Sequence, residues 1–554
     1  MRKHIDTKSR GQLFFMQTYE GDEIPKRTKW IFSSAGAFRD AAYQLVSSFL
    51  LTFMMYSGVL GTYSSSWDAS GQYSAQIVVI NIIFVICLIW DGLNDPIMGF
   101  IIEKVRFKTG KYKPWILIGG IGNTIVMLCL FLCKPTGWWY VLCFGIFYFL
   151  WDFVFTMNDC AYWAMVPSLT SGEKQRNNIT FLVSLFISVG TFVMYGVCSL
   201  FPTATNSYYI YGIIAVVSSV LFLASQLAIF FFCQEKRIDP TQQKASEGTK
   251  ITDMFKMIAK NKPLLIVVIA IFLYYAAASL VVSFGSNYFY LCFGYGGDAG
   301  GSIMLVFTVM YAIGTIAAQL LFKPLINHFK RQTLLTWCFF VAIVAYAVLF
   351  LVGFPLFSDK PLAYNEADPS GLLWAFGGSL SLLYIPPLFF FGAQGIFYMV
   401  LLVMLQNCIE YNQWKFGERK EAVASSWRPF TAKISSALQK GLIMVSFLSA
   451  GIYGITQQIS DVQTNLAHDV SLAQTDEERA ALEQAAANEV DAIIAAVDAG
   501  SKNVMGLWMV GSALLFLIAS YCLIHFGYKI DEGFYAKIEK EIKERESLAN
   551  QEAD

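Results

Sequence analysis

Two aspartates, Asp91 and Asp95, stand four residues apart within the apolar segment IIFVICLIWDGLNDPIMGFII. Residues i and i+4 of a helix lie on one face, so the two carboxylates would be neighbours. An ionised carboxylate at the centre of a bilayer costs roughly 2.5 to 3.5 kcal/mol on insertion scales. A hydrophobic helix that keeps two carboxylates on one face is therefore expected to bind a cation or a proton with them.

Other oxygen-bearing side chains stand close to this pair in the sequence pattern. Asn94 lies between the two aspartates, and Thr156 precedes Asp159 by three residues, about one helical turn. Carboxylate, amide and hydroxyl oxygens suit a hard cation such as Na⁺. Two close carboxylates could instead share a proton, because like charges oppose double ionisation. The residues favour a cation site with Asp91 and Asp95 as its main ligands, and Na⁺ and H⁺ both stay open.

Further charges lie within apolar stretches. Asp40 follows Arg39 in AGAFRDAAYQL, Asp159 lies in YFLWDFVFTMNDCAYWAMVP, and Lys433 lies in SSWRPFTAKISSALQKGLIMV. Intramembrane ions usually face the protein interior and pair with one another. We therefore expect Lys433 to neutralise the acids when the cation is absent. Asp152, seven residues before Asp159, is assigned a structural role.

Sugars are bound by carboxylates that accept hydrogen bonds from hydroxyls and by aromatic rings that pack on the C–H faces. Asp40 and Asp159 are the candidate acceptors, and Trp163 and Tyr398 are the candidate platforms. Aromatic residues make up 16% of the chain, so a single aromatic side chain is often only part of the core or of an interface belt.

The composition indicates a membrane protein. The 554 residues are 56% hydrophobic and 14% charged, whereas soluble domains carry about 25% charged residues. The net charge of zero gives no overall field that would favour nucleic acid. The eleven cysteines form no CxxC pair, and no nucleophile–base pair or phosphate-binding glycine motif is present. We expect neither an enzyme nor a cofactor.

Twelve hydrophobic spans are predicted, which makes the chain an all-α membrane protein. They cover residues 35–61, 76–103, 114–133, 139–165, 178–201, 207–233, 262–290, 302–322, 332–354, 372–410, 424–456 and 504–527. The tenth and eleventh regions exceed one span, so each is expected to include extra helix.

Loop charge predicts the orientation. Basic residues crowd the segment before the first span, the loop after the second span and the central loop, whereas the alternate loops hold few. The positive-inside rule then places both termini in the cytoplasm. The predicted parts are a cytoplasmic tail (1–34), a six-helix half (35–233), a central cytoplasmic loop (234–261), a second six-helix half (262–528) and a cytoplasmic tail (529–554). Two such halves around a midplane site are typical of major-facilitator transporters.

An unusual insertion covers residues 457–503 on the predicted outer side. Thr475 with Glu478 forms a capping-box signature that predicts a helix start, and Gly500 is the predicted helix stop. The segment is interpreted either as a solvated acidic spacer or as a lid or docking surface, and the sequence leaves both open.

Several segments resemble the glycoside–pentoside–hexuronide:cation symporters, the melibiose-permease-like branch of the major facilitator superfamily. WDGLNDPIMGFIIEKVRFKTGKYKPWILIGG is similar to the second span and following loop of that family. AFRD, WDFVFTMNDCAYWAMVPSLT and CIEYNQWKFGERKEAVASSWRPFTAK resemble its first span, its fourth span and the approach to its eleventh. The resemblance covers most of the chain, fails in the insertion and weakens in the N-terminal tail.

The resemblance implies two neighbouring sites. The implied cation site consists of Asp91, Asn94, Asp95 and Thr156. The implied sugar site consists of Asp40, Arg39, Asp159, Trp163, Lys433 and Tyr398, the last where melibiose permease has a tryptophan. Thr180 replaces a sugar-binding arginine, Asn407 replaces an acid, and Arg428 is an additional cation with the pattern of a gate or snorkelling residue. These departures leave the particular sugar open.

The sequence thus predicts a symporter of the bacterial inner membrane that imports a glycoside or oligosaccharide with Na⁺ or H⁺. Its partners would be the sugar, the cation and the lipid bilayer. Two alternatives stay open: a transporter of a lysolipid or other amphipathic solute, and a non-transporting membrane sensor that uses the insertion as its partner surface.

Overall fold

A computed structural model provides the structure of the chain. It describes residues 18–19, 23–60, 72–105, 107, 109–135, 137–169, 173–202, 205–236, 258–293, 299–364, 381–417 and 427–553. The predicted central loop lies outside the described residues apart from 234–236 and 258–261. Two short strands, β1 (Thr18–Tyr19) and β2 (Glu235–Lys236), pair in parallel, and nearly everything else described is helix.

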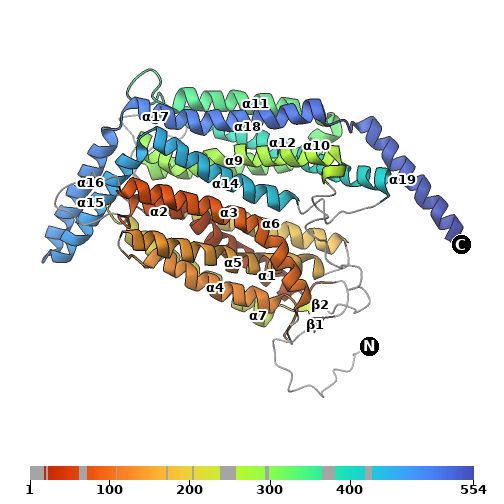
Figure 1. Cartoon of the computed structure of the whole chain (residues 1–554), viewed down its shortest axis with the longest axis horizontal. Helices are drawn as coiled ribbons and strands as arrows, with labels where there is room; N and C mark the ends of the chain where they lie inside the picture. The colour runs from red at the N-terminus through yellow and green to blue at the C-terminus, as the bar shows by residue number, and fades with distance from the viewer. Residues whose placement is uncertain are drawn as a thin grey trace, which may run out of the picture.

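One group of helices comes from the first part of the chain and lies in the lower half of Figure 1. Its members are α1 (Lys26–Gln44), the π-helical η3 (Leu45–Phe49), α2 (Leu50–Tyr56), α3 (Gln72–Lys104), α4 (Lys113–Leu132), α5 (Trp138–Ser168), α6 (Glu173–Leu200) and α7 (Ser207–Phe232). Helix α1 packs on α6 and α7, while α5 packs on α3 and α4. The predicted first span corresponds to α1, η3 and α2, which follow one another without a break.

The second group comes from the later part of the chain and lies above the first in Figure 1. Its members are α9 (Lys262–Phe293), α10 (Ala299–His328), α11 (Arg331–Gly353), α12 (Ser381–Phe416), α14 (Trp427–Ser449), α17 (Ala499–Gly506), η5 (Leu507–Gly511), α18 (Ser512–Cys522) and η6 (Leu523–Gly527). Helix α19 (Glu532–Ala553) follows and contacts α12. The two groups meet where α14 packs on α3 and where α10 packs on α6.

Apolar helices of this length satisfy their backbone polar groups internally, as a bilayer requires. Ten described helices are long and apolar enough to cross a membrane, and α14 with α15 (Ile452–Leu472) gives an eleventh if this bent pair is one span. The protein is therefore a multi-pass integral membrane protein. The count of twelve spans stays a prediction.

The insertion forms a helical arm at one end of the molecule (Figure 1). The chain bends by 87° between α14 and α15, and Gly451 at this break has a left-handed φ of 68°. Thr475 and Glu478 form the predicted capping box at the start of α16 (Asp476–Ala495). The predicted stop at Gly500 is wrong: α16 ends at Ala495, and Asp498 caps α17, which includes Gly500.

Helix α15 contacts the first group of helices at this insertion end. The Thr464 hydroxyl on α15 donates to the Gly58 carbonyl just after α2 at 3.1 Å. Gly58 has a φ of 66°, and a Cβ there would lie 2.8 Å from the Thr464 oxygen. The Asn81 amide of α3 donates to the Tyr453 hydroxyl of α15 at 3.3 Å. These contacts tie α15 to the first group of helices.

Glu235 anchors the opposite end, where α4 begins. Its carboxylate accepts hydrogen bonds from the backbone N–H groups of Lys111, Tyr112 and Lys113 at 2.8, 3.0 and 2.8 Å. Unpaired N–H groups and the helix dipole both favour a negative charge at a helix N-terminus. The start of the central loop is therefore fixed to the loop that follows α3.

Candidate functional site

The two aspartates of α3 meet Lys433 of α14. The Lys433 Nζ donates to Asp91 Oδ1 at 2.8 Å and to Asp95 Oδ1 at 2.6 Å. The one-turn spacing on α3 brings both carboxylates within reach of a single ammonium, as expected from their i, i+4 relation. One cation thus offsets the repulsion between the two acids, and the bond crosses from one helix group to the other.

The two remaining residues of the predicted cation site differ in their contacts. The Thr156 hydroxyl on α5 donates to Asp91 Oδ1 at 2.7 Å, and both groups are buried. Asn94 is also buried, and its Nδ2 has no hydrogen-bond partner among the described residues. The four residues thus supply carboxylate, hydroxyl and amide groups. Within the described ranges, no three His, Cys, Asp or Glu side chains gather into a metal cluster.

A second charge cluster joins α1 to α5. Arg39 donates from Nη2 to Asp40 Oδ2 at 2.7 Å and from Nη1 to Asp159 Oδ1 at 2.7 Å. The Arg39 side chain is only 2% exposed, whereas that of Asp159 is 29% exposed. The guanidinium lies over the Tyr162 ring at 4.3 Å and 5.7 Å from the centroid of Trp163. Four of the predicted sugar-site residues are therefore brought together, with Arg39 holding both acids.

The cation and sugar candidates share helix α5. Thr156, bound to Asp91, and Asp159, bound to Arg39, are three residues apart on this helix. Cys160, the next residue, lies with its sulfur 3.9 Å from Asp95 Oδ1. Helix α5 therefore contacts both charge clusters and connects the two candidate sites.

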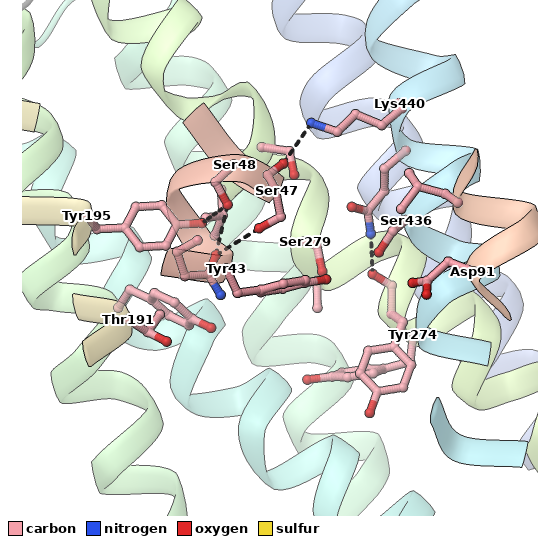
Figure 2. A pocket seen from close by; sticks show the side chains of 18 of the residues that line it. Tyr43, Ser47, Ser48, Asp91, Thr191, Tyr195, Tyr274, Ser279, Ser436 and Lys440 are labelled. Carbon is pink, nitrogen blue, oxygen red and sulfur yellow. Dashed lines mark hydrogen bonds between the residues drawn. The ribbon is translucent and has the colours of Figure 1, made fainter. Parts of the chain in front are cut away.

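A cavity of about 350 Å³ lies between the two helix groups. Tyrosines, serines and glutamines line much of it, and Figure 2 shows these side chains converging from both groups. Of the predicted site residues, Asp91 and Tyr398 line this cavity, and the others do not. A mixture of hydroxyls, amides and aromatic faces can bind a polyhydroxylated ring by hydrogen bonds and stacking.

Tyr398 belongs to an aromatic group on one wall of the cavity. Its hydroxyl lies 2.5 Å from that of Tyr275, and its ring stacks on Tyr274 with centroids 5.1 Å apart. The Arg428 guanidinium interacts with the hydroxyls of Tyr275 and Tyr398. Arg428 therefore links α14 to α9 and α12 beside the cavity. Thr180 is exposed near the start of α6 and does not line the cavity.

Sequence reasoning missed several cavity residues. Tyr43, Gln44, Gln394 and Lys440 line it, and so does Asp152, which was assigned a structural role. Lys440 and Asp152 had a usable signal, because a charged residue in an apolar stretch is costly. Tyrosines and glutamines carry no such signal in a chain rich in aromatic residues.

Comparison with known proteins identifies the family. A family model described as MFS/sugar transport protein matches residues 39–474. The chain belongs to this family. The predicted resemblance and the all-α major-facilitator fold are thereby confirmed. The matched segment includes both charge clusters, the cavity-lining residues and all of α15.

Individual relatives of this sugar transport family are distant. The lactose permease of Lactobacillus delbrueckii subsp. bulgaricus is 25% identical over 438 residues, which cover 76% of this chain and 62% of that protein. The raffinose carrier protein of Pediococcus pentosaceus is 24% identical and covers 75% and 62%. The chain thus spans 62% of the length of these two relatives. The crystal structure of the nucleoside transporter NupG matches with a TM-score of 0.51 at 12% identity, covering 90% of this chain and 99% of that chain; it shares the fold.

Proposed function

We propose that the protein is a secondary active symporter that imports a glycoside or oligosaccharide together with Na⁺ or H⁺. Membership of the MFS/sugar transport family and the names of the relatives, a lactose permease and a raffinose carrier protein, support a sugar substrate. The proposal places the chain in a bacterial inner membrane with both termini in the cytoplasm. It includes no catalysed reaction, no cofactor and no nucleic-acid partner.

The observation that carries the proposal is the position of Lys433 between Asp91 and Asp95. In this arrangement the lysine occupies the place of the coupling cation. Entry of Na⁺ or H⁺ would bind the carboxylates, with the Thr156 hydroxyl and the Asn94 amide as further oxygen ligands for Na⁺. The Lys433 ammonium would then be released from both acids.

This exchange gives a physical route from cation binding to movement. Lys433 lies on α14 and the acids lie on α3, so their bonds hold the two helix groups together. Replacing the ammonium by a small cation removes this bond while the acids stay neutralised. The groups can then rock around the cavity, which is the alternating-access movement of such carriers.

Sugar binding would be coupled to the same helices. Asp40 and Asp159, oriented by Arg39, would accept hydrogen bonds from sugar hydroxyls, with Trp163 and Tyr398 as stacking platforms. Helix α5 carries both Thr156 and Asp159, so either ligand fixes a helix that the other needs. The coupling must be reciprocal: the sugar should tighten cation binding by the same factor as the cation tightens sugar binding.

Uptake into proteoliposomes tests the proposal. Wild type, Asp95→Asn and the control Asp359→Asn, at an exposed position, would be given a panel of labelled glycosides under an imposed Na⁺ or H⁺ gradient. We expect accumulation in wild type and the control, driven by one of the ions, and its loss in Asp95→Asn. If the uptake of every glycoside were independent of both ion gradients, symport would be overturned. Uptake of a lysolipid in place of any glycoside would establish an amphipathic substrate.

A further inference from the structure

Helix α14 carries a second buried lysine whose surroundings differ from those of Lys433. Lys440 lies seven residues further along, two turns on, so the two lysines lie on nearly the same helix face. Lys433 binds two carboxylates, whereas the described hydrogen bond of Lys440 goes to the backbone carbonyl of Ser47 at 3.1 Å. Its Nζ also lies 5.3 Å from the centroid of the Phe84 ring.

These contacts do not satisfy a charged ammonium. Lys440 is 9% exposed, and a lysine ammonium has three N–H donors. One carbonyl accepts one of them, and no described carboxylate forms an ion pair with the side chain. A buried charge is costly unless it is paired. Because Lys440 lines the cavity, the missing counter-charge can come from the molecule that occupies the cavity.

The acids that line the same cavity are engaged elsewhere or lie apart. Asp91 already accepts hydrogen bonds from Lys433 and Thr156. Asp152 is 5% exposed on α5, and its Oδ2 has no hydrogen-bond partner among the described residues. No ion pair joins Asp152 to Lys440 in the described part of the chain. The Asp152 oxygen is available to accept a hydroxyl, while Lys440 remains a donor without an anionic acceptor.

The surroundings of Lys440 suit a sugar that bears an acid group. Figure 2 shows Lys440 facing the cavity beside Ser47, with Ser48 and Tyr195 on the neighbouring wall. The Ser48 hydroxyl lies 2.9 Å from that of Tyr195 and 2.9 Å from Gln44 Oε1. These neutral hydroxyl and amide groups can bind sugar hydroxyls, and the ammonium adds one positive charge at the edge of that polar surface.

We propose that the transported glycoside carries an anionic substituent, a carboxylate or a sulfate, and that Lys440 binds it. The inference rests on the proposed function and extends its glycoside site from Asp40 and Asp159 to the cavity, which the proposed stacking residue Tyr398 also lines. A neutral glycoside would cover the ammonium and leave its charge unpaired. An anionic glycoside would supply the counter-charge and form a charge-assisted hydrogen bond, which is roughly twice as strong as a neutral one.

Binding of matched glycosides to the full-length protein in lipid nanodiscs tests this proposal. The probes are methyl β-glucoside, its 6-sulfate and methyl β-glucuronide, with the corresponding galactose series, and calorimetry gives each Kd. We expect wild type to bind one anionic member at least about tenfold more tightly than its neutral partner, which corresponds to 1.4 kcal/mol. Lys440→Gln should lose that ratio, while Lys440→Arg should keep most of it. Lys502→Gln, which changes a buried lysine outside the cavity, should keep it fully.

The outcomes separate this inference from the proposed function. Equal or tighter binding of the neutral members by wild type, or binding of no probe, overturns the inference without any variant. An unchanged ratio in Lys440→Gln also overturns it. The carboxylate and sulfate members distinguish the two acid groups. Tight binding of an anionic glycoside without gradient-driven uptake would instead overturn symport and leave the role of Lys440 standing.

Discussion

The Lys433 Nζ lies 2.6 Å from Asp95 Oδ1, although the two residues are separated by 338 positions in the chain and belong to different helix groups. The same ammonium binds Asp91. Both acids and the lysine are mostly buried, so each charge depends on the others for its stability. The proposed exchange of the ammonium for a cation would therefore change a contact between the two helix groups.

Replacing Lys433 by methionine should destabilise the protein in the absence of a coupling cation. The two carboxylates would face each other without a counter-charge, and removal of one partner of a buried pair costs about 3 to 5 kcal/mol. Added Na⁺, or acidification if H⁺ is the coupling ion, should restore much of the loss. Thermal unfolding of purified Lys433→Met with and without the cation measures both effects.

The matched control for that experiment is Lys323→Met, at an exposed position on α10. Its unfolding temperature should follow that of wild type in every buffer. A Lys433→Met protein that is as stable as wild type and indifferent to Na⁺ and pH would contradict the role of the lysine as an internal stand-in for the cation.

Replacing Arg39 by glutamine should weaken glycoside binding by at least about tenfold, since one lost charge-assisted interaction is worth 1.5 kcal/mol or more. Arg39 orients both Asp40 and Asp159, whose freed carboxylates would repel each other. The response of unfolding temperature to the cation should persist, because Asp91, Asp95 and Lys433 keep their contacts. Direct binding and thermal unfolding, run on one preparation, separate the two effects.

Arg331→Gln provides a comparison for the Arg39 variant. Arg331 also pairs with a carboxylate, that of Glu532, but away from the cavity and with a partly exposed partner. Glycoside binding by the Arg331→Gln variant should equal that of wild type. Equal losses in the two arginine variants would mean that Arg39 acts through general stability and not through the sugar site.

Replacing Glu235 by glutamine should lower stability by about 1 to 2 kcal/mol, the range found for loss of a helix cap or of a favourable charge at a helix end. A neutral amide oxygen would replace the carboxylate that accepts three backbone N–H groups at the start of α4. Chemical or thermal unfolding measures the change. Glu489→Gln, exposed on α16, should have no effect, and equal stabilities of the two variants would refute the anchoring role.

Replacing Gly58 by alanine should loosen the insertion end of the molecule. The left-handed conformation costs a non-glycine residue about 1 to 2 kcal/mol, and the new methyl group would press on the Thr464 hydroxyl. Hydrogen exchange of backbone amides around residues 460–464 should therefore accelerate.

Gly451→Ala separates strain from contact, because Gly451 has nearly the same φ and no atom within 4 Å of its would-be Cβ. Gly451→Ala should lower the stability of the protein as Gly58→Ala does. It should leave the hydrogen exchange of backbone amides near Thr464 unchanged. Acceleration of the same size in both variants would show that contact between α15 and α2 is not what holds this end closed.

Charge in an apolar setting predicted much of the candidate site. Asp91, Asp95 and Lys433 are costly in a bilayer, so their pairing could be expected from their presence alone. The capping box of α16 was predictable because it depends on two residues three positions apart. Asn94 and Thr156 entered as possible cation ligands through the oxygen atoms beside the acids, and the resemblance to a family implied the same roles.

A competing local signal accounts for the error at Gly500, and tertiary packing decided the cavity. Gly500 was predicted to end a helix. Instead, the Asp498 carboxylate accepts a hydrogen bond from the Ser501 N–H and caps α17, which includes Gly500. The cavity wall is built mainly of residues whose types recur throughout the chain, so only the folded arrangement of both helix groups distinguishes them. The bend at Gly451 likewise becomes evident only in the fold, where it directs α15 to the segment after α2.

That bend has a mechanical consequence. Helix α14 carries Lys433 and Lys440, and only two residues separate it from α15, which rests on the chain segment after α2. The arm is thus connected through this bend to α14, the helix that places Lys433 in the ion cluster. A neighbouring protein or an antibody fragment bound to the arm is therefore expected to slow the proposed transport cycle without contacting the sugar.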